Sequence, residues 1–292
     1  MSYPALLAKT NELVSAAQTM GALGAELRLR QMGKDGDPSV RGALQAVLKN
    51  LGPGLLDGLE PGQIAATIGL ATYALQEALD LISEPERSPG WSYKEPAILQ
   101  ERGRGSRVVA RNFATLARQR PALAGVLENC RFLDIGTGVG WLAIEAAKTW
   151  PGMQVVGIDI WEPSLQLAAT NVAAEGMQDR ITLRRQSVAE IDDEAAFDLI
   201  WVSSPFLSRE VVDRALPRVV RALAPSGFLV FGIFASRPDP LNQALTDLLT
   251  IRSGGHPWRS EEVEERLRAL GLRNVEYTVA DAVGSFVIGQ RQ

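Results

Sequence analysis

The chain has 292 residues, 46% of them hydrophobic and 22% charged, and its net charge at pH 7 is −4. A core of about 160 residues plus a second module is the expected organisation for this length. The negative charge excludes the cationic footprint with which nucleic-acid binders neutralise phosphates, so no nucleic-acid partner is expected.

Cysteine and histidine usage excludes further classes. Cys130 is the only cysteine, so the chain forms no internal disulfide and a reducing, cytoplasmic setting is favoured. With one histidine in addition, no metal site is predicted. The start of the chain lacks a basic segment followed by an apolar core, and no run of about 18 apolar residues occurs, so no membrane partner is expected.

The first third of the chain predicts helices. Apolar residues recur at near-helical spacing over residues 5–30 and again over residues 61–82, where Pro61 suits a helix start. Residues 83–96 contain three prolines and predict either a domain linker or a loop over an active site. The helices form a separate module or simply cover a sheet; both interpretations are open.

A basic stretch follows at residues 102–111, with arginines at positions 102, 104, 107 and 111. A solvated helix entrance is the favoured interpretation, and a phosphate groove is the alternative.

Residues 131–140, RFLDIGTGVG, pass from an apolar run through an acid into three alternating glycines. The pattern predicts a buried strand and a sharp turn, followed by a helix over Trp141 to Ala147. A dinucleotide site needs a small residue at the sixth place of G-x-G-x-x-G, where this chain has Trp141. Tryptophan there argues against NAD or FAD.

The run from Asp134 to Gly140, DIGTGVG, resembles the D/E-x-G-x-G-x-G signature of class I S-adenosylmethionine-dependent methyltransferases. A glycine turn that only shapes a strand-to-helix corner is the alternative. The resemblance implies an α/β fold: a Rossmann-like, doubly wound, seven-stranded, mostly parallel sheet with an antiparallel last strand. It also implies S-adenosyl-L-methionine as the cofactor.

The same resemblance implies roles for the loop. The Asp134 carboxylate would face the positive amino group of the cofactor. The rest of the loop would cradle the methionine and ribose parts. Its cofactor-binding residues are Gly136, Thr137, Gly138 and Gly140.

The second strand is predicted at residues 154–160 and contains Asp159, an acid placed to bind both ribose hydroxyls. By resemblance, Ile160 and Trp161 border the adenine, although Trp161 suits a core or surface position equally well. A crossover helix is predicted at residues 163–175, between Pro163 and Gly176.

Residues 181–186, 197–206 and 225–234 predict the third, fourth and fifth strands. After the third strand the family usually has an acid that binds the adenine amino group. Ser187 and Val188 stand there instead, offering a hydroxyl and a backbone amide.

Further elements complete the fold. Residues 239–251 predict a helix, another begins near Ser260, and NVEYTVA and SFVIGQR predict a hairpin through Asp281 to Gly284.

Candidate catalytic residues lie after the fourth strand and in the loop before the last helix. Ser203 and Phe206 would border the reaction centre, with Ser203 also near the cofactor. His256 is the candidate base, against the alternative of a structural or surface histidine.

Methyl transfer to an O, N or C atom of a small molecule is the favoured function. The segment Ser203 to Phe206, SSPF, also resembles the (D/N/S)-P-P-(Y/F) element of N-methyltransferases acting on nucleic-acid bases or protein amides, although Ser204 departs from it. A non-catalytic cofactor-binding scaffold is a third possibility.

The predicted domains are residues 1–95 and residues 96–292. The first, helical part resembles the lid and dimerisation modules of small-molecule methyltransferases, which implies a homodimer through the N-terminal helices. The second part is the predicted Rossmann-like methyltransferase domain.

Overall fold

The computed structural model describes residues 2–235, 239–279 and 284–292. The chain folds as two compact units, Met1–Arg87 and Ser88–Gln292. Their division falls inside the proline-rich segment, near the predicted boundary after residue 95. No helix of the described residues combines the length and apolar character needed to span a bilayer.

The first unit is helical. Its helices are α1 (Tyr3–Met32), α2 (Pro38–Leu51) and α3 (Pro61–Ser83). All three have a proline in the first turn, where the missing amide donor costs nothing. A small core that includes Leu27 and Ile68 joins them, so the helices predicted over residues 5–30 and 61–82 are confirmed.

The second unit begins with three helices whose bounds the sequence did not predict. They are α4 (Pro96–Arg104), α5 (Arg107–Gln119) and α6 (Pro121–Glu128). Phe113 of α5 is fully buried, and its ring meets that of Phe132 edge to face with centroids 5.8 Å apart. This contact attaches the helices to the first strand of the sheet.

The strands of the described residues form one seven-stranded sheet in the order β3-β2-β1-β4-β5-β7-β6. The strands are β1 (Arg131–Ile135), β2 (Gln154–Asp159), β3 (Ile181–Arg185), β4 (Phe197–Ser203), β5 (Leu223–Phe234), β6 (Arg273–Val279) and β7 (Gly284–Gln290). β7 runs antiparallel to both of its neighbours, and the other pairs are parallel. The predicted fold class is confirmed. Most of the turn predicted through Asp281 to Gly284 lies outside the described residues.

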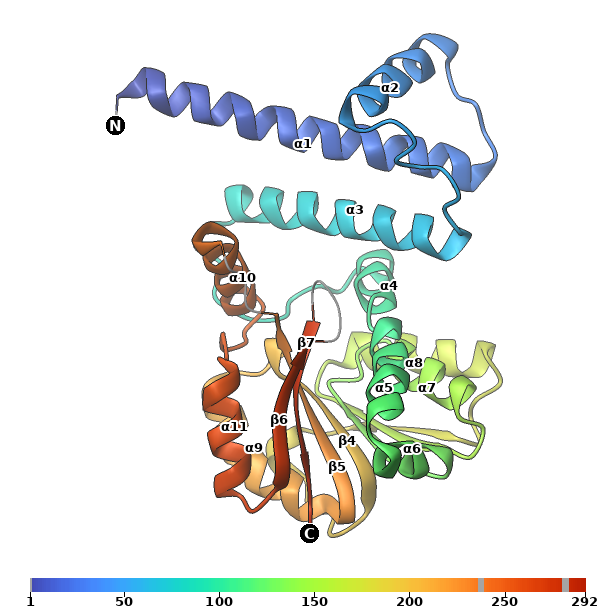
Figure 1. Cartoon of the computed structure of the whole chain (residues 1–292), viewed down its shortest axis with the longest axis vertical. Helices are drawn as coiled ribbons and strands as arrows, with labels where there is room; N and C mark the ends of the chain where they lie inside the picture. Colours follow the sequence, from blue (N-terminus) through green and yellow to red (C-terminus); the bar gives the residue numbers. More distant parts are fainter. Residues whose placement is uncertain (1, 236–238, 280–283) are drawn as a thin grey trace. The chain divides into compact units, whose positions relative to one another are not determined.

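Helices cover both faces of the sheet (Figure 1). The helices of the second unit that follow β1 are α7 (Trp141–Thr149), α8 (Glu162–Ala174), α9 (Arg209–Ala222), α10 (Pro240–Arg252) and α11 (Ser260–Ala269). Neighbouring side chains of β1 enter different layers: Phe132 packs with residues of α4 to α8, and Leu133 with residues of α9 and α11. Burial on both faces explains the continuous apolar character of the strand.

We predict that Phe132→Ala lowers the free energy of unfolding by about 3–5 kcal/mol, because a fully buried ring is removed and leaves a cavity. Urea denaturation measures this loss. Leu241→Ala, at a side chain that is 64% exposed, is the matched control and should change the free energy by less than about 0.5 kcal/mol. Equal losses in the two variants would contradict the assignment of the core.

Candidate functional site

The glycine loop after β1 lies at the carboxyl edge of the sheet. The amides of Gly136 and Thr137 both donate to the Ile158 carbonyl of β2, at 2.9 and 3.1 Å. The backbone φ angles of Gly136, Gly138 and Gly140 are 77°, 56° and 84°, values that residues with a Cβ atom rarely adopt. A Cβ added at Gly138 would meet no atom within 4 Å, so the backbone here faces open space. The loop is therefore shaped to let a ligand approach closely.

Asp134, in β1 just before this loop, is a buried carboxyl group. Thr137 Oγ1 donates to its Oδ2 at 2.7 Å. Burial raises the pKa of Asp134 to about 7; the Thr137 hydrogen bond opposes this rise and the charge of Asp159 adds to it. A positive group placed beside Asp134 would stabilise its ionised form, so the position favours a cationic ligand.

Asp159 ends β2 and is tied to the same loop. Its Oδ2 accepts from the Gly138 amide at 2.9 Å and its Oδ1 from the Trp161 amide at 2.8 Å. Burial raises the pKa of Asp159, and the backbone hydrogen bonds oppose the rise. A carboxylate has about four acceptor sites, so both oxygens keep capacity for two further donors such as sugar hydroxyls.

The residues predicted to border the adenine follow Asp159. Ile160 is 67% exposed, which leaves an apolar side chain on the surface at the end of β2. Trp161 is half-buried, and its Nε1 donates to the Tyr93 carbonyl at 2.8 Å. Both stand next to Asp159, and their contact with adenine stays a prediction.

Ser187 and Val188 follow β3. The Ser187 hydroxyl accepts from the Ala189 amide at 3.3 Å and opens the short 3₁₀ helix η1 (Val188–Glu190). Its O–H is still able to donate to a ring nitrogen. The Val188 side chain is buried in the core, which leaves backbone chemistry as its contribution to any site.

The segment after β4 reaches the glycine loop. A Cβ added at Gly136 would lie 3.5 Å from Ser203 Cβ, so Ser203 abuts the loop. The short 3₁₀ helix η2 (Ser204–Phe206) follows, and within it the buried Ser204 hydroxyl donates to the Gly232 carbonyl at 2.6 Å. Phe206 is 46% exposed. The structure thus brings Ser203 beside the predicted cofactor loop and leaves the Phe206 ring accessible.

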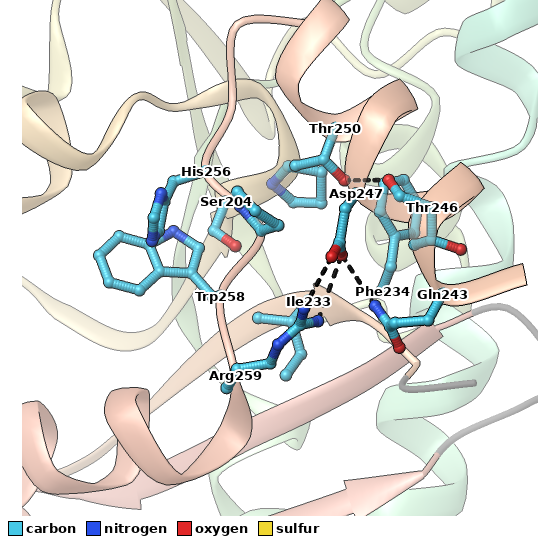
Figure 2. Close-up of a pocket in the computed structure, with 12 residues that line it drawn as sticks. Ser204, Ile233, Phe234, Gln243, Thr246, Asp247, Thr250, His256, Trp258 and Arg259 are labelled. Atoms are coloured by element: carbon cyan, nitrogen blue, oxygen red, sulfur yellow. Dashed lines mark hydrogen bonds and ion pairs between the residues drawn. The ribbon is translucent and has the colours of Figure 1, made fainter. Parts of the chain in front are cut away.

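His256 lies in the loop between α10 and α11 and lines a small pocket with Ser204 and Pro205 (Figure 2). Its Nε2 is 3.3 Å from Arg209 Nη1 and 3.9 Å from Glu262 Oε2. Burial lowers the pKa of His256, and the charge of Arg209 lowers it further. Arg209 and Glu262 thus hold the imidazole ring in place, and its role as a base stays a prediction.

Trp91, Tyr93 and Arg102 form a cluster with Phe206 that no sequence motif predicts. Trp91 meets Phe206 edge to face with centroids 5.5 Å apart, and Tyr93 with centroids 5.4 Å apart. The Arg102 guanidinium lies 4.1 Å from the centre of the Tyr93 ring. The only signal was the proline-rich segment, predicted as a linker or a loop over the active site. The division between the two units falls within it, as a linker requires, and its Trp91 contacts Phe206.

Trp141 also has partners that its sequence position did not reveal. Its indole N–H donates to Gln100 at 2.8 Å, and the Arg107 guanidinium lies 3.9 Å from its ring centre. Asn171 of α8 completes the network by donating to the Val139 carbonyl at 2.8 Å. Helices α4 and α5 thereby brace the glycine loop. In the basic stretch, Arg107 is thus engaged with a ring rather than free in a groove.

No group of three or more His, Cys, Asp or Glu side chains suited to a metal occurs in the described part of the chain. The chemistry at this edge of the sheet is that of two carboxyl groups, a glycine loop and several aromatic rings.

Comparisons with known proteins agree with this geometry. Residues 132–227, from β1 into β5, match a family described as a methyltransferase domain. This chain carries a class I, S-adenosylmethionine-dependent methyltransferase domain. The residues at this edge fit S-adenosylmethionine. Buried Asp134 suits the ammonium group of the cofactor, and half-buried Asp159, which has spare acceptor sites, suits the ribose hydroxyls.

Relatives of the methyltransferase domain differ in their acceptors. Over 120 residues the chain is 42% identical to a ribosomal protein uL3 glutamine methyltransferase of Bordetella pertussis, a match covering 38% of this chain and 40% of that protein. Over 127 residues it is 34% identical to a demethylmenaquinone methyltransferase of Thermus thermophilus, covering 43% and 57%. The matched segment therefore spans less than two thirds of either relative.

A solved structure resembles the chain over its whole length. The O-methyltransferase family protein from Burkholderia thailandensis has a TM-score of 0.67 at 12% identity, covering 100% of this chain and 99% of that one. At this identity the likeness establishes the fold, including the presence of N-terminal helices, and leaves the acceptor undefined.

The raised pKa of Asp134 predicts how ligand binding depends on pH. Below about pH 7 the carboxyl of the unliganded protein carries a proton that must leave before it can pair with an ammonium group. Affinity for S-adenosylhomocysteine should therefore fall by up to roughly tenfold per unit as the pH drops below 7. Calorimetry over a range of about two pH units that reaches from below this pKa to just above it measures the change in affinity. An Asp134→Asn variant with the same pH dependence would contradict the assignment.

Proposed function

We propose that this protein transfers a methyl group from S-adenosylmethionine to a small-molecule acceptor at an O, N or C atom. The observation that carries the proposal is the convergence of Asp134, Asp159 and Ser203 on one glycine loop. When bound, the cofactor supplies a methyl group activated by a positively charged sulfur. The protein must then orient the acceptor and exclude water.

The chain's own residues divide this task. The Asp134 carboxylate holds the ammonium group, and Asp159 accepts hydrogen bonds from the ribose hydroxyls. Ile160 and Trp161 cover one side of the adenine, while Ser187 and the Val188 amide face its polar edge. Gly136, Thr137, Gly138 and Gly140 line the methionine and ribose parts.

Ser203 and Phe206 border the acceptor, because Ser203 abuts the glycine loop and Phe206 presents an exposed ring three residues later. His256 is neutral at pH 7, since its pKa is lowered, and is therefore able to accept a proton. To reach an acceptor, its Nε2 would have to leave Arg209. Acceptors that ionise without help suit this site best.

A small-molecule acceptor is favoured over a macromolecule on three grounds. The net charge of −4 offers no footprint for a nucleic acid. The rings of Trp91 and Phe206 offer apolar contacts to an acceptor. The demethylmenaquinone relative acts on a small molecule by its name. A cytoplasmic location and the absence of nucleic-acid and membrane partners remain predictions from composition.

A second candidate, N-methylation of a protein amide, is favoured by the 42% identity to a glutamine methyltransferase and by the SSPF segment. Methylation of a nucleic-acid base and a non-catalytic cofactor-binding scaffold are weaker alternatives. Incubation with labelled S-adenosylmethionine and separate pools of phenols, carboxylates, amines, ribosomal protein and RNA distinguishes them. The proposal expects label in a small molecule; label in protein or RNA alone would overturn it.

Asp159→Ala should weaken the binding of S-adenosylhomocysteine by roughly tenfold to a hundredfold, the loss expected for one or two hydrogen bonds to ribose. Calorimetry measures the affinity. Asp192→Ala, at an exposed carboxylate after η1, is the matched control and should bind like the wild type. Unchanged affinity in Asp159→Ala would refute the ribose role.

The N-terminal unit is proposed to form a homodimer. The first half of α1 is exposed and carries apolar side chains that a partner could bury, among them Leu6 at 55% and Leu13 at 60% exposure. Size-exclusion chromatography with light scattering should give twice the monomer mass for the full chain. The variant Leu6→Lys/Leu13→Lys should shift it to the monomer, whereas Lys9→Ala should not. A full-length monomer would contradict the proposal.

A further inference from the structure

The segment before α4 crosses the carboxyl edge of the sheet. At one end the Gly90 amide donates to the Arg252 carbonyl at 3.1 Å. At the other, Trp161 Nε1 donates to the Tyr93 carbonyl at 2.8 Å. Trp161 follows β2, and the loop after Arg252 packs on the turn after β4, where a Cβ at Gly255 would collide with the Pro205 carbonyl. Because β2 and β4 flank β1, the segment spans the edge on which the β1 glycine loop lies.

Trp91 lies midway along this crossing and forms a right-angled pair with Phe206, with an interplanar angle of 86°. Phe206 is 46% exposed, and Trp91 packs against the core on one side but is only half-buried, so both rings keep exposed surface. Ser203, three residues before Phe206, abuts Gly136 of the loop. The accessible rings therefore stand beside the place where the methyl group is proposed to be transferred.

The positive charge of Arg102 lies against the rings of Trp91 and Tyr93. The Arg102 guanidinium lies 4.1 Å from the Tyr93 ring centre and 5.4 Å from the Trp91 ring centre. An aromatic face that already attracts one cation is a poor site for a second, and the charge repels a cationic ligand nearby. The same charge favours a neutral or anionic group.

We infer that Trp91 and Phe206 form the acceptor wall and that, with Arg102 against Trp91, they select planar aromatic acceptors that are neutral or anionic over aliphatic or cationic ones. The inference rests on the proposed function, since it names the substrate class of that site. Stacking on the wall orients the ring of the acceptor toward Ser203 and the glycine loop. Arg102 acts through the rings and is a positioning and charge-selecting residue.

Equilibrium binding tests the wall without requiring turnover. The full-length protein, saturated with S-adenosylhomocysteine at low salt, is titrated with benzoate, cyclohexanecarboxylate and benzylamine and followed by NMR. Benzoate should bind roughly tenfold more tightly than either of the other two probes, because one lacks the aromatic face and the other has the wrong charge.

Variants of Trp91 and Arg102 test which residue causes each part of the preference for benzoate. Trp91→Leu should bring the benzoate and cyclohexanecarboxylate affinities close together, whereas Trp91→Phe should keep most of the difference. Arg102→Gln should reduce the preference for benzoate over benzylamine. Arg104→Gln removes an exposed arginine from the same helix as a matched control and should leave that preference unchanged.

The outcomes separate the inference from the proposed function. Equal affinities for the three probes, an unchanged preference in Trp91→Leu, or tighter binding of a glutamine peptide than of benzoate would overturn the acceptor wall. Binding of S-adenosylhomocysteine by each variant reports correct folding, and Phe206→Leu replaces any variant that loses it. If the wild type fails to bind S-adenosylhomocysteine, the proposed function is wrong. The relative affinities of the three probes, measured without S-adenosylhomocysteine, then still test whether Trp91 and Phe206 form an acceptor wall.

Discussion

The buried carboxyl group of Asp134 is the constraint around which the site is arranged. Its nearest side-chain donor is Thr137, and this single neutral hydrogen bond does not offset the removal of the carboxyl from water, as its pKa of about 7 shows. Thr137 reaches it because the glycine loop turns back over the end of β1. The same turn points the Gly138 amide at Asp159 and so couples the ends of β1 and β2. A cationic ligand would complete this arrangement.

The elements of the sheet followed from local patterns, and the contacts between distant segments did not. The strands around Asp134 and Asp159 were predictable because burial on both faces imposes continuous apolar runs, and because the turn between them requires glycine at left-handed positions. Helix α9, which includes Pro217, was not predicted. Its buried residues Val212, Leu216 and Val219 recur at helical spacing, so the apolar pattern was present in the sequence, and the interior proline argued against reading it as a helix.

Contacts between residues far apart in the sequence could not be predicted for the candidate site, because they depend on tertiary packing. The pairing of Trp91 with Phe206 joins positions more than a hundred residues apart, and no spacing rule connects them. The partner of Trp141, Gln100, likewise comes from a helix outside the signature. The sequence identified His256 only as a candidate base, and the structure adds that its ring contacts Arg209. Local motifs thus predicted the residues of the proposed cofactor end, while the proposed acceptor end depends on tertiary packing.

The two kinds of likeness describe different parts of the molecule. Similarity in sequence covers part of the chain: the family match spans residues 132–227, and the relatives named for a protein and a small-molecule acceptor match over 120 and 127 residues. Likeness in structure extends over the whole chain and includes the N-terminal helices. The side chains near Phe206 are therefore the best indication of the class of acceptor. A crystal structure of the full chain with S-adenosylhomocysteine is the decisive measurement. We expect its ammonium group beside Asp134 and its ribose beside Asp159; density for the ligand at any other place, or none, would contradict the site described above.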